Sequence, residues 1–261
     1  MLATVEYIGK ATLNATKSWQ DTFSLAFNIL LTVFKKKPYR STTLTVLINQ
    51  IYFTAIQILP LFLSVSAIIG FLLIGILLQT LKELELAEYL GRIIMGFMVT
   101  ELSPLITVLL IALRSSSAMN TEIATMKVNR ELHTLEVYNI DVLSYLFFPR
   151  VLSGVISVVL LSGIFSIVAL VSGFICSKLI FGMSQDTYAN LLLNSAEVSD
   201  IIIILVKCST FGFFITLIPI RSGLNASDEL TSIPVAVLNG MVSVFIAIVI
   251  IEVLTLIARS I

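Results

Sequence analysis

Residues 41–81 read STTLTVLINQIYFTAIQILPLFLSVSAIIGFLLIGILLQTL, and none of these 41 side chains is charged at neutral pH. Two further uncharged runs follow, with 27 residues at 151–177 and 22 residues at 230–251. About 20 helical residues cross a bilayer core that is about 30 Å thick. Each run is therefore long enough to span a membrane, and the first is too long for a single span.

Two more segments qualify as spans, although isolated charges interrupt them. Residues 91–113 contain Arg92 and Glu101, and residues 201–220 contain Lys207. The pattern therefore predicts an all-α membrane protein with five transmembrane helices, near 59–81, 91–113, 151–177, 201–220 and 234–258.

The composition favours the same class. Apolar side chains make up 57% of the chain and charged ones 12%, against about 25% charged in soluble domains. Sixteen basic residues balance sixteen acidic ones, which argues against a nucleic-acid-binding protein with its basic face. One histidine and two cysteines in apolar runs predict neither a metal site nor a disulfide. The sequence also lacks a phosphate-binding glycine loop, so any ATP hydrolysis is expected on another chain.

Residues 1–57 are predicted to form interfacial helices that precede a five-span domain at 58–261. The apolar run at 22–34 has 13 residues, too few to span, and is followed by three lysines and Pro38. Residues 41–57 place apolar side chains at helical spacing among polar ones, which is typical of a helix lying in the membrane surface. Pro60 marks a predicted bend into the first span.

The distribution of basic residues predicts the orientation. With the N-terminus in the cytoplasm, eleven Lys and Arg residues lie inside, four lie outside and Lys207 lies within a span. Because basic residues concentrate on the cytoplasmic side, we expect a cytoplasmic N-terminus and a periplasmic C-terminus. No Ser- and Arg-rich transit peptide is seen, which favours a bacterial inner membrane over a plastid envelope.

The segment between the second and third spans, Arg114 to Pro149, is the longest predicted loop. Loops of this length usually have a function. Its centre, residues 129–138, is predicted to form a short helix with Asn129 as N-cap. A solvated surface helix and a helix that contacts a partner are both compatible with its composition.

Besides Arg92 at the edge of the second span, three ionisable residues lie within the spans, where a charge is costly and often functional. Glu101 lies three residues before Pro104, so it either organises a local break in the helix or faces a cavity. Lys207 is expected to extend its side chain to the membrane surface, with a lipid headgroup contact as the alternative. Glu252 is expected to reach the outer interface.

Arg114 lies at the cytoplasmic end of the second span. A cation there complements the carbonyl end of a helix. Alternatively, Arg114 orients the following loop through Glu122 or Asp141.

The region from Glu101 to Arg150 carries a set of residues at characteristic spacing. They are Glu101, Leu102, Pro104, Arg114, Ser117, Ala118, Glu122, Ile123, Thr125, Met126, Leu135, Asp141, Tyr145, Leu146, Pro149 and Arg150. This set resembles the E-L-G-P, G-R-x-G-S-A-x-x-A-E-I-x-T-M, M-G-x-D-P, Y-L and P-R motifs of the MlaE/YrbE permeases, the membrane subunits of MCE-type lipid ABC transporters. Further matches over nearly the whole chain are Gln50, Tyr52, Pro60, Gln79, Leu254 and Thr255.

The resemblance implies a homodimeric permease that moves lipid, phospholipid above all, between the inner membrane and a periplasmic MCE-domain hexamer. Such a system would contribute to outer-membrane lipid homeostasis. A cytoplasmic ABC ATPase dimer would bind ATP and Mg, and a STAS-domain protein is a further candidate partner. This chain would be a non-catalytic subunit that binds no cofactor itself.

The resemblance also implies residue roles. The ATPase would dock on a coupling helix through Arg130, Glu131, Leu132, Leu135, Glu136 and Asp141. The loop would be oriented by Arg114, Glu122 and Arg150. The lipid cavity, lined by the first, second and fifth spans, has as candidate residues Glu101, Leu72 and Leu73.

Several positions depart from the family pattern and indicate a divergent branch. Glycines of the family are replaced by Leu113, Ser115, Ser116 and Asn139. Arg130 and Val142 also differ, and the acid of the last span has no counterpart at Ile251, with Glu252 one residue on.

Other classes of protein remain as alternatives. An ion-gradient-driven secondary transporter without an ATPase is the first, although five spans do not divide into paired halves. A channel or a structural scaffold would be insensitive to nucleotide. An intramembrane enzyme would need a cluster of catalytic side chains that one histidine does not provide.

Overall fold

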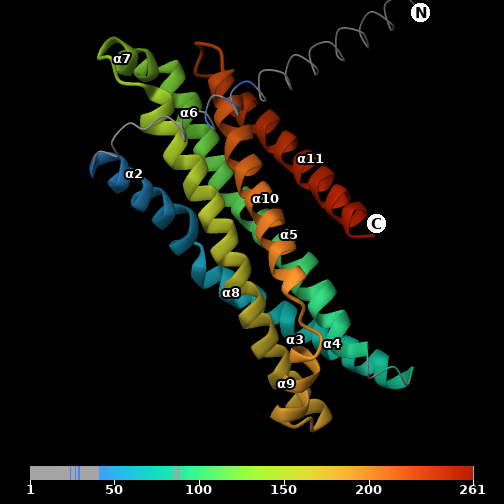
Figure 1. Ribbon diagram of the computed structural model, residues 1–261. Coiled ribbons are helices and arrows are strands. Elements are labelled where there is room, and N and C mark those ends of the chain that lie inside the picture. Colours follow the sequence, from blue (N-terminus) through green and yellow to red (C-terminus); the bar gives the residue numbers. More distant parts are fainter. Residues whose placement is uncertain are drawn as a thin grey trace, which may run out of the picture.

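The computed structural model describes residues 41–84, 86 and 89–260, together with Ser24, Phe27 and Ile29. This part of the chain forms helices and no strand (Figure 1). Five stretches are long and apolar enough to cross a membrane: Thr45–Glu83, Leu90–Val128, Leu143–Phe181, Val198–Leu224 and Ser232–Arg259. All five predicted spans are confirmed. The predicted interfacial helix at 22–34 lies almost wholly outside the described residues.

The elements follow one another in a simple order. The first half contains α2 (Ser41–Ile51), η1 (Tyr52–Ile56), α3 (Leu59–Glu83), α4 (Leu90–Ile93), η3 (Ile94–Leu102), α5 (Ser103–Ile111), η4 (Ala112–Ser116) and α6 (Ser117–Val128). The second half contains α7 (Glu131–Val137), η5 (Leu143–Phe147), α8 (Phe148–Phe181), α9 (Gln185–Leu193), α10 (Val198–Leu224) and α11 (Ser232–Ser260).

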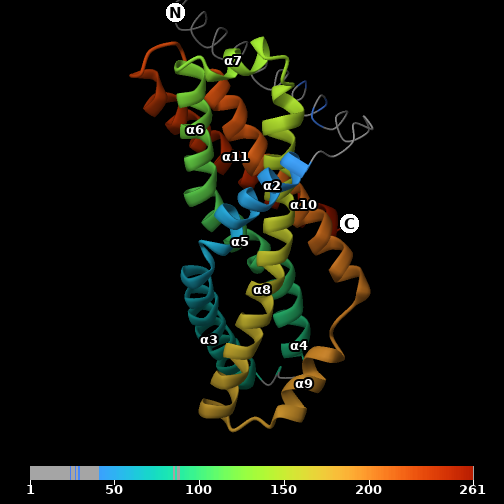
Figure 2. The ribbon, with the colours of Figure 1, turned by 90° about the vertical axis from the view of Figure 1, so that its left-hand side faces the viewer.

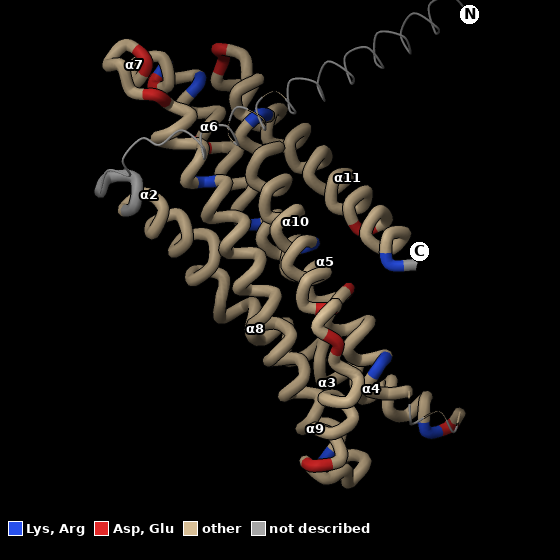
Figure 3. The backbone as a smooth tube through the Cα atoms, in the orientation of Figure 1, with Lys and Arg blue, Asp and Glu red and all other residues tan. Residues whose placement is uncertain are grey.

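The long helix α8 is the centre of the bundle. It packs against α3, α10, α2 and α5, while α11 packs on α10 and α6. The 39 residues of η5 and α8 measure about 58 Å at 1.5 Å per residue, well beyond a bilayer core. The bundle therefore has two distant ends, with α7 at one and α9 at the other (Figure 2). Charged residues gather mostly at these ends (Figure 3).

Three of the four π-helical segments in the described part of the chain are followed closely by proline. Pro60, Pro104 and Pro149 each come two to four residues after the end of η1, η3 and η5. Proline has no N–H and its ring clashes with the carbonyl four residues earlier, so the chain before it opens into wider turns. The predicted bend at Pro60 is confirmed, because a turn at residues 57–58 separates η1 from α3.

Pro219 lies inside α10 and leaves the Ile215 carbonyl without its usual helical donor. The Ser116 hydroxyl of η4 donates to that carbonyl at 2.7 Å. Both side chains are buried. Ser116 thus provides a hydrogen bond between the second and fourth spans.

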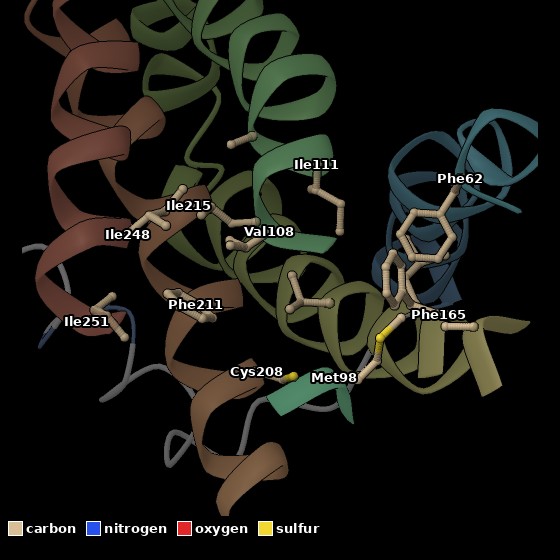
Figure 4. Close-up of a cluster of buried hydrophobic side chains, with 14 of the residues drawn as sticks. Phe62, Met98, Val108, Ile111, Phe165, Cys208, Phe211, Ile215, Ile248 and Ile251 are labelled. Carbon is tan, nitrogen blue, oxygen red and sulfur yellow. The ribbon is translucent and has the colours of Figure 1, made fainter. Parts of the chain in front are cut away.

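Close helix contacts and aromatic side chains build the core. A Cβ on Gly212 of α10 would lie 2.5 Å from the Val155 Cα of α8, so only glycine permits this approach. Phe62 of α3 meets Phe165 of α8 edge to face, with ring centroids 5.8 Å apart (Figure 4). Figure 4 also shows Phe211 on the fourth span, facing this core.

The helix α9 covers the end of the bundle opposite α7. Its Tyr188 is buried and donates to the Leu170 carbonyl of α8 at 3.1 Å. Burial raises the pKa of the Tyr188 phenol, so this group remains a donor at physiological pH.

The prediction of a loop from Arg114 to Pro149 is wrong for the first half of this segment. The helix of the second span continues through η4 and α6 to Val128, and only residues 129–142 connect it to the third span. The apolar stretch ends at Arg114, but the helix itself can continue into water when its side chains are polar. The interfacial position of α2 stays a prediction.

Candidate functional site

The first candidate site is the connection that carries α7. A short helix is present where one was predicted, at Glu131–Val137. The predicted N-cap is wrong, because Asn129 is the C-cap of α6 and its N–H donates to the Thr125 carbonyl at 2.9 Å. Arg130 then turns the chain with a left-handed φ of 59°. These two residues separate α7 from α6.

One side of α7 is held by the bundle and the other is exposed. Leu132 is buried and Leu135 half-buried, and both pack on a cluster that includes Ile123 and Leu146. Leu132 therefore anchors the helix in the bundle. Because its side chain is buried, it is not available for the predicted contact with an ATPase. The exposed side chains are Arg130, Glu131, Glu136, Val137 and Tyr138.

Asp141 holds the start of the returning helix. One carboxylate oxygen accepts from the Leu143 N–H at 3.2 Å, and the other accepts from the Ser144 hydroxyl. A carboxylate in this position stabilises a helix N-terminus. The side chain is exposed, and its contact with an ATPase stays a prediction.

An ion pair joins the two helices that flank α7. Arg150 of α8 donates to the Glu122 carboxylate of α6. The Arg150 side chain is 1% exposed and that of Glu122 is 54% exposed. The partner of Glu122 is therefore Arg150. The hypothesis that Arg114 orients the loop through Glu122 is wrong. Arg114 instead lies beside η1 in a cavity.

A second cluster of charges lies between the second, fourth and fifth spans. Lys207 of α10 donates to Glu101 of η3 and, at 2.9 Å, to Glu252 of α11. The Lys207 side chain is 1% exposed, and the two carboxylate side chains are 11% and 13% exposed. Lys207 was expected to reach the membrane surface and Glu252 the outer interface, and both predictions are wrong. Pairing inside the bundle offsets part of the cost of charge in apolar surroundings.

Arg259, near the end of α11, extends this cluster. Its guanidinium donates to Glu101 at 3.0 Å and to the Thr100 hydroxyl at 2.6 Å. It also donates to the Gly96 carbonyl at 2.8 Å and lies 3.7 Å from the Asp200 carboxylate. Glu101 thus accepts from two basic side chains within the π-helical turns before Pro104, and both of its predicted roles stay predictions. We call Glu101, Asp200, Lys207, Glu252 and Arg259 the ion network.

The sequence does not show which of these charged side chains meet. The signal that could have found the ion network is that charges of both signs occur within the spans, where an unpaired charge is costly.

Two cavities lie along the seam between α10 and α11. The one nearer the α7 end has a volume of about 730 Å³ and a polar lining that includes Arg221, Asn225, Asn239 and Ser243. The second, of about 370 Å³, is lined by largely apolar residues, among them Phe214, Ile250, Ile251 and Leu254. A seam with a polar and an apolar compartment suits an amphipathic molecule.

The two leucines predicted to line a cavity lie elsewhere. Leu72 is exposed on α3, and Leu73 packs against the hydrophobic core. Their role in a cavity between two copies of the chain stays a prediction. Within the described residues, no group of three or more His, Cys, Asp or Glu side chains could hold a metal ion.

The fold and the buried ion network define a multi-pass helical membrane protein. The family described as Permease MlaE matches residues 47–258. The chain therefore belongs to the MlaE permease family.

Relatives carry names of the same kind. A "Probable ABC transporter permease protein" of Rickettsia felis is 24% identical over 216 residues, which cover 83% of this chain and 82% of the relative. "Protein TRIGALACTOSYLDIACYLGLYCEROL 1, chloroplastic" of Arabidopsis thaliana is 26% identical over 85% of this chain and 64% of its own length. "Probable ABC transporter permease protein ycf63" of Porphyra purpurea is 23% identical over 81% and 80%. The chain is thus a permease subunit of an ABC-type transporter, which works with an ATPase.

Proposed function

We propose that this permease moves lipid, phospholipid above all, between the bacterial inner membrane and a periplasmic MCE-domain partner. The observation that carries the proposal is the seam between α10 and α11, with a polar cavity nearer α7 and an apolar cavity further along the two helices. A phospholipid has the same division, with a charged headgroup and acyl chains. The name of the Arabidopsis relative includes the word for a diacylglycerol lipid, which supports a lipid substrate.

The proposed ATPase contact is the exposed side of α7. Leu132 anchors this helix in the bundle, and Glu122 with Arg150 ties its two flanking helices together. A force applied to α7 would therefore move α6 and α8 as rigid elements. ATP and Mg belong to the ATPase in this proposal, and the permease binds neither.

The proposed assembly is a homodimer with an ATPase dimer on the α7 side, an MCE-domain hexamer on the α9 side and a STAS-domain protein as a further candidate. The N-terminus would be cytoplasmic and the C-terminus periplasmic. Support comes from α11, where the polar residues Asn239 and Ser243 line the 730 Å³ cavity. Such polar groups in a membrane are expected to face protein or a polar ligand rather than acyl chains.

Affinity purification of the tagged permease in mild detergent tests the proposal, with mass spectrometry of bound proteins and lipids. We expect an ATPase, an MCE-domain protein and phospholipid. A lone protein without lipid, whose transport responds to an ion gradient and not to ATP, would contradict it. Family membership already favours the ABC class over that secondary transporter.

A further inference from the structure

A cavity on the opposite side of α6 from the α10–α11 seam is not used by the proposed function. It has a volume of about 350 Å³ and lies between α2 with η1 on one side and η4 with α6 on the other. Polar side chains of both walls line it, including Gln50, Gln57, Arg114, Ser115 and Glu122.

Two of these groups are left ready for a ligand. The Ser115 hydroxyl is buried and has no hydrogen-bond partner within the described residues, which is costly unless a ligand or water completes it. The Arg114 side chain is exposed, and the described part of the chain gives it no carboxylate partner. A guanidinium, a hydroxyl and two amides form a donor set that suits a phosphate group.

The depth of the cavity matches the headgroup region of a bilayer. Arg92 and Arg114 enclose 21 residues of the second span, about 32 Å of helix and close to the thickness of the hydrocarbon core. Arg114 therefore lies at one surface of the membrane. It is the surface on the α7 side, which the distribution of basic residues predicts to be cytoplasmic.

The charges are ordered along α6. Arg114, Ala118 and Glu122 line the cavity at intervals of four residues, so they share one face of the helix. The cation is on the membrane side and the carboxylate about 12 Å further toward water. Glu122 is 54% exposed although it pairs with Arg150. A zwitterionic phospholipid has the complementary order, with phosphate next to the acyl chains and an ammonium group beyond it.

We propose that this cavity binds the headgroup of a zwitterionic phospholipid of the phosphoethanolamine type from the cytoplasmic leaflet, with the phosphate at Arg114 and Ser115 and the ammonium at Glu122. The inference deepens the proposed function and rests on it for the lipid class. It assigns a second lipid site, separate from the seam between α10 and α11.

Photo-crosslinking tests the site directly. Phe53 lines the cavity and is exposed, so the full-length Phe53→p-benzoylphenylalanine variant is placed in nanodiscs with equal amounts of phosphatidylethanolamine and phosphatidylglycerol. Irradiation is followed by mass spectrometry of the lipid adducts. We expect phosphatidylethanolamine adducts in clear excess, and a loss of about tenfold or more in Arg114→Gln, because a charge-assisted hydrogen bond is removed.

Two controls define a negative result. Arg92→Gln neutralises the arginine at the other end of the same span and should leave the adducts unchanged. A probe at Ile68, exposed on α3, reports the surrounding lipid. Adducts at Phe53 that follow the bulk composition, equal those at Ile68 or survive Arg114→Gln would overturn the proposal, provided that the variant elutes as the folded protein.

The outcome is separable from the proposed function. ATP-dependent lipid transfer with no specific adduct would overturn only the cavity. A specific adduct without any ATP-dependent lipid transfer would count against the proposed function and leave the site.

Discussion

The Glu122–Arg150 pair at the α7 end and the ion network between α10, α11 and η3 both join helices, but their surroundings differ. In the first, one partner is half exposed to solvent and the pair stands next to an exposed helix. In the second, every carboxylate and ammonium side chain is at least four-fifths buried, apart from the Arg259 guanidinium. The exposed α7 end therefore suits the proposed contact with a partner, whereas the ion network joins three spans inside the bundle.

The largest effect is expected from Lys207→Met. The change leaves Glu101 and Glu252 without their shared cation, and breaking a buried pair costs about 3–5 kcal/mol. Thermal unfolding in detergent should show a large loss of stability or of folded protein. Lys178→Met, at an exposed lysine of α8, is the matched control and should be close to neutral.

A triple variant sharpens the same comparison. Combining Lys207→Met with Glu101→Gln and Glu252→Gln removes all three charges, and neutral replacements of a buried ion network are often tolerated. It should recover most of the stability lost in the single variant. A single variant as stable as the wild type would show that the ion network does not hold the spans.

Gly212→Ala is expected to have the next largest effect. The new Cβ would lie 2.5 Å from the Val155 Cα, and overpacking of this kind costs about 1–3 kcal/mol. Gly163→Ala on α8, where no atom lies within 4 Å of the new Cβ, is the control. Equal unfolding temperatures for the two variants would contradict the close packing of α8 and α10.

Ser116→Ala removes the hydroxyl that donates to the Ile215 carbonyl. A lost buried hydrogen bond costs about 1 kcal/mol, and Pro219 offers no replacement donor. Chemical unfolding of the reconstituted protein should detect the loss. Ser117→Ala, whose exposed hydroxyl bonds only within its own helix, should change stability by less than about 0.5 kcal/mol; a similar loss in both would remove the special role of Ser116.

Charge reversal on α7 should have the smallest effect on stability. Glu131→Lys with Glu136→Lys alters exposed side chains, which usually shifts stability by less than about 0.5 kcal/mol. Because like charges or lost pairs disfavour an interface, co-purification of the ATPase should fall strongly. Asp186→Lys, on α9 at the other end, is the control; wild-type ATPase yield in the double variant would exclude this side of α7 as the contact.

Hydropathy was sufficient to locate the five spans, because long uncharged runs have few other uses. It failed at the end of the second span, where the helix continues from Arg114 to Val128 with polar side chains. The side chains change from apolar to polar at the membrane surface, but the backbone hydrogen bonds of the helix continue past it. The short helix α7 was predicted, but its start was placed at Asn129. The left-handed turn at Arg130 instead makes Glu131 its first residue.

The site was predicted less completely than the fold. Lys207 and Glu101 are 106 residues apart in the chain, and the position of a residue along a helix does not show which neighbour its side chain meets. The same limit applies to Ser116 and Ile215. Family motifs marked Arg114, Glu122 and Arg150, but only the folded structure shows that Arg150 pairs with Glu122 and that Arg114 lines a cavity.

We propose above all that this ABC permease moves lipid in a step driven by ATP. The most direct measurement is transfer of a fluorescent phospholipid from proteoliposomes holding the permease and its ATPase to acceptors carrying the MCE-domain partner. We expect transfer that needs ATP hydrolysis, is unaffected by ionophores and is lost in the α7 double variant. Transfer that continues without ATP and stops when an ionophore dissipates the ion gradient would contradict it.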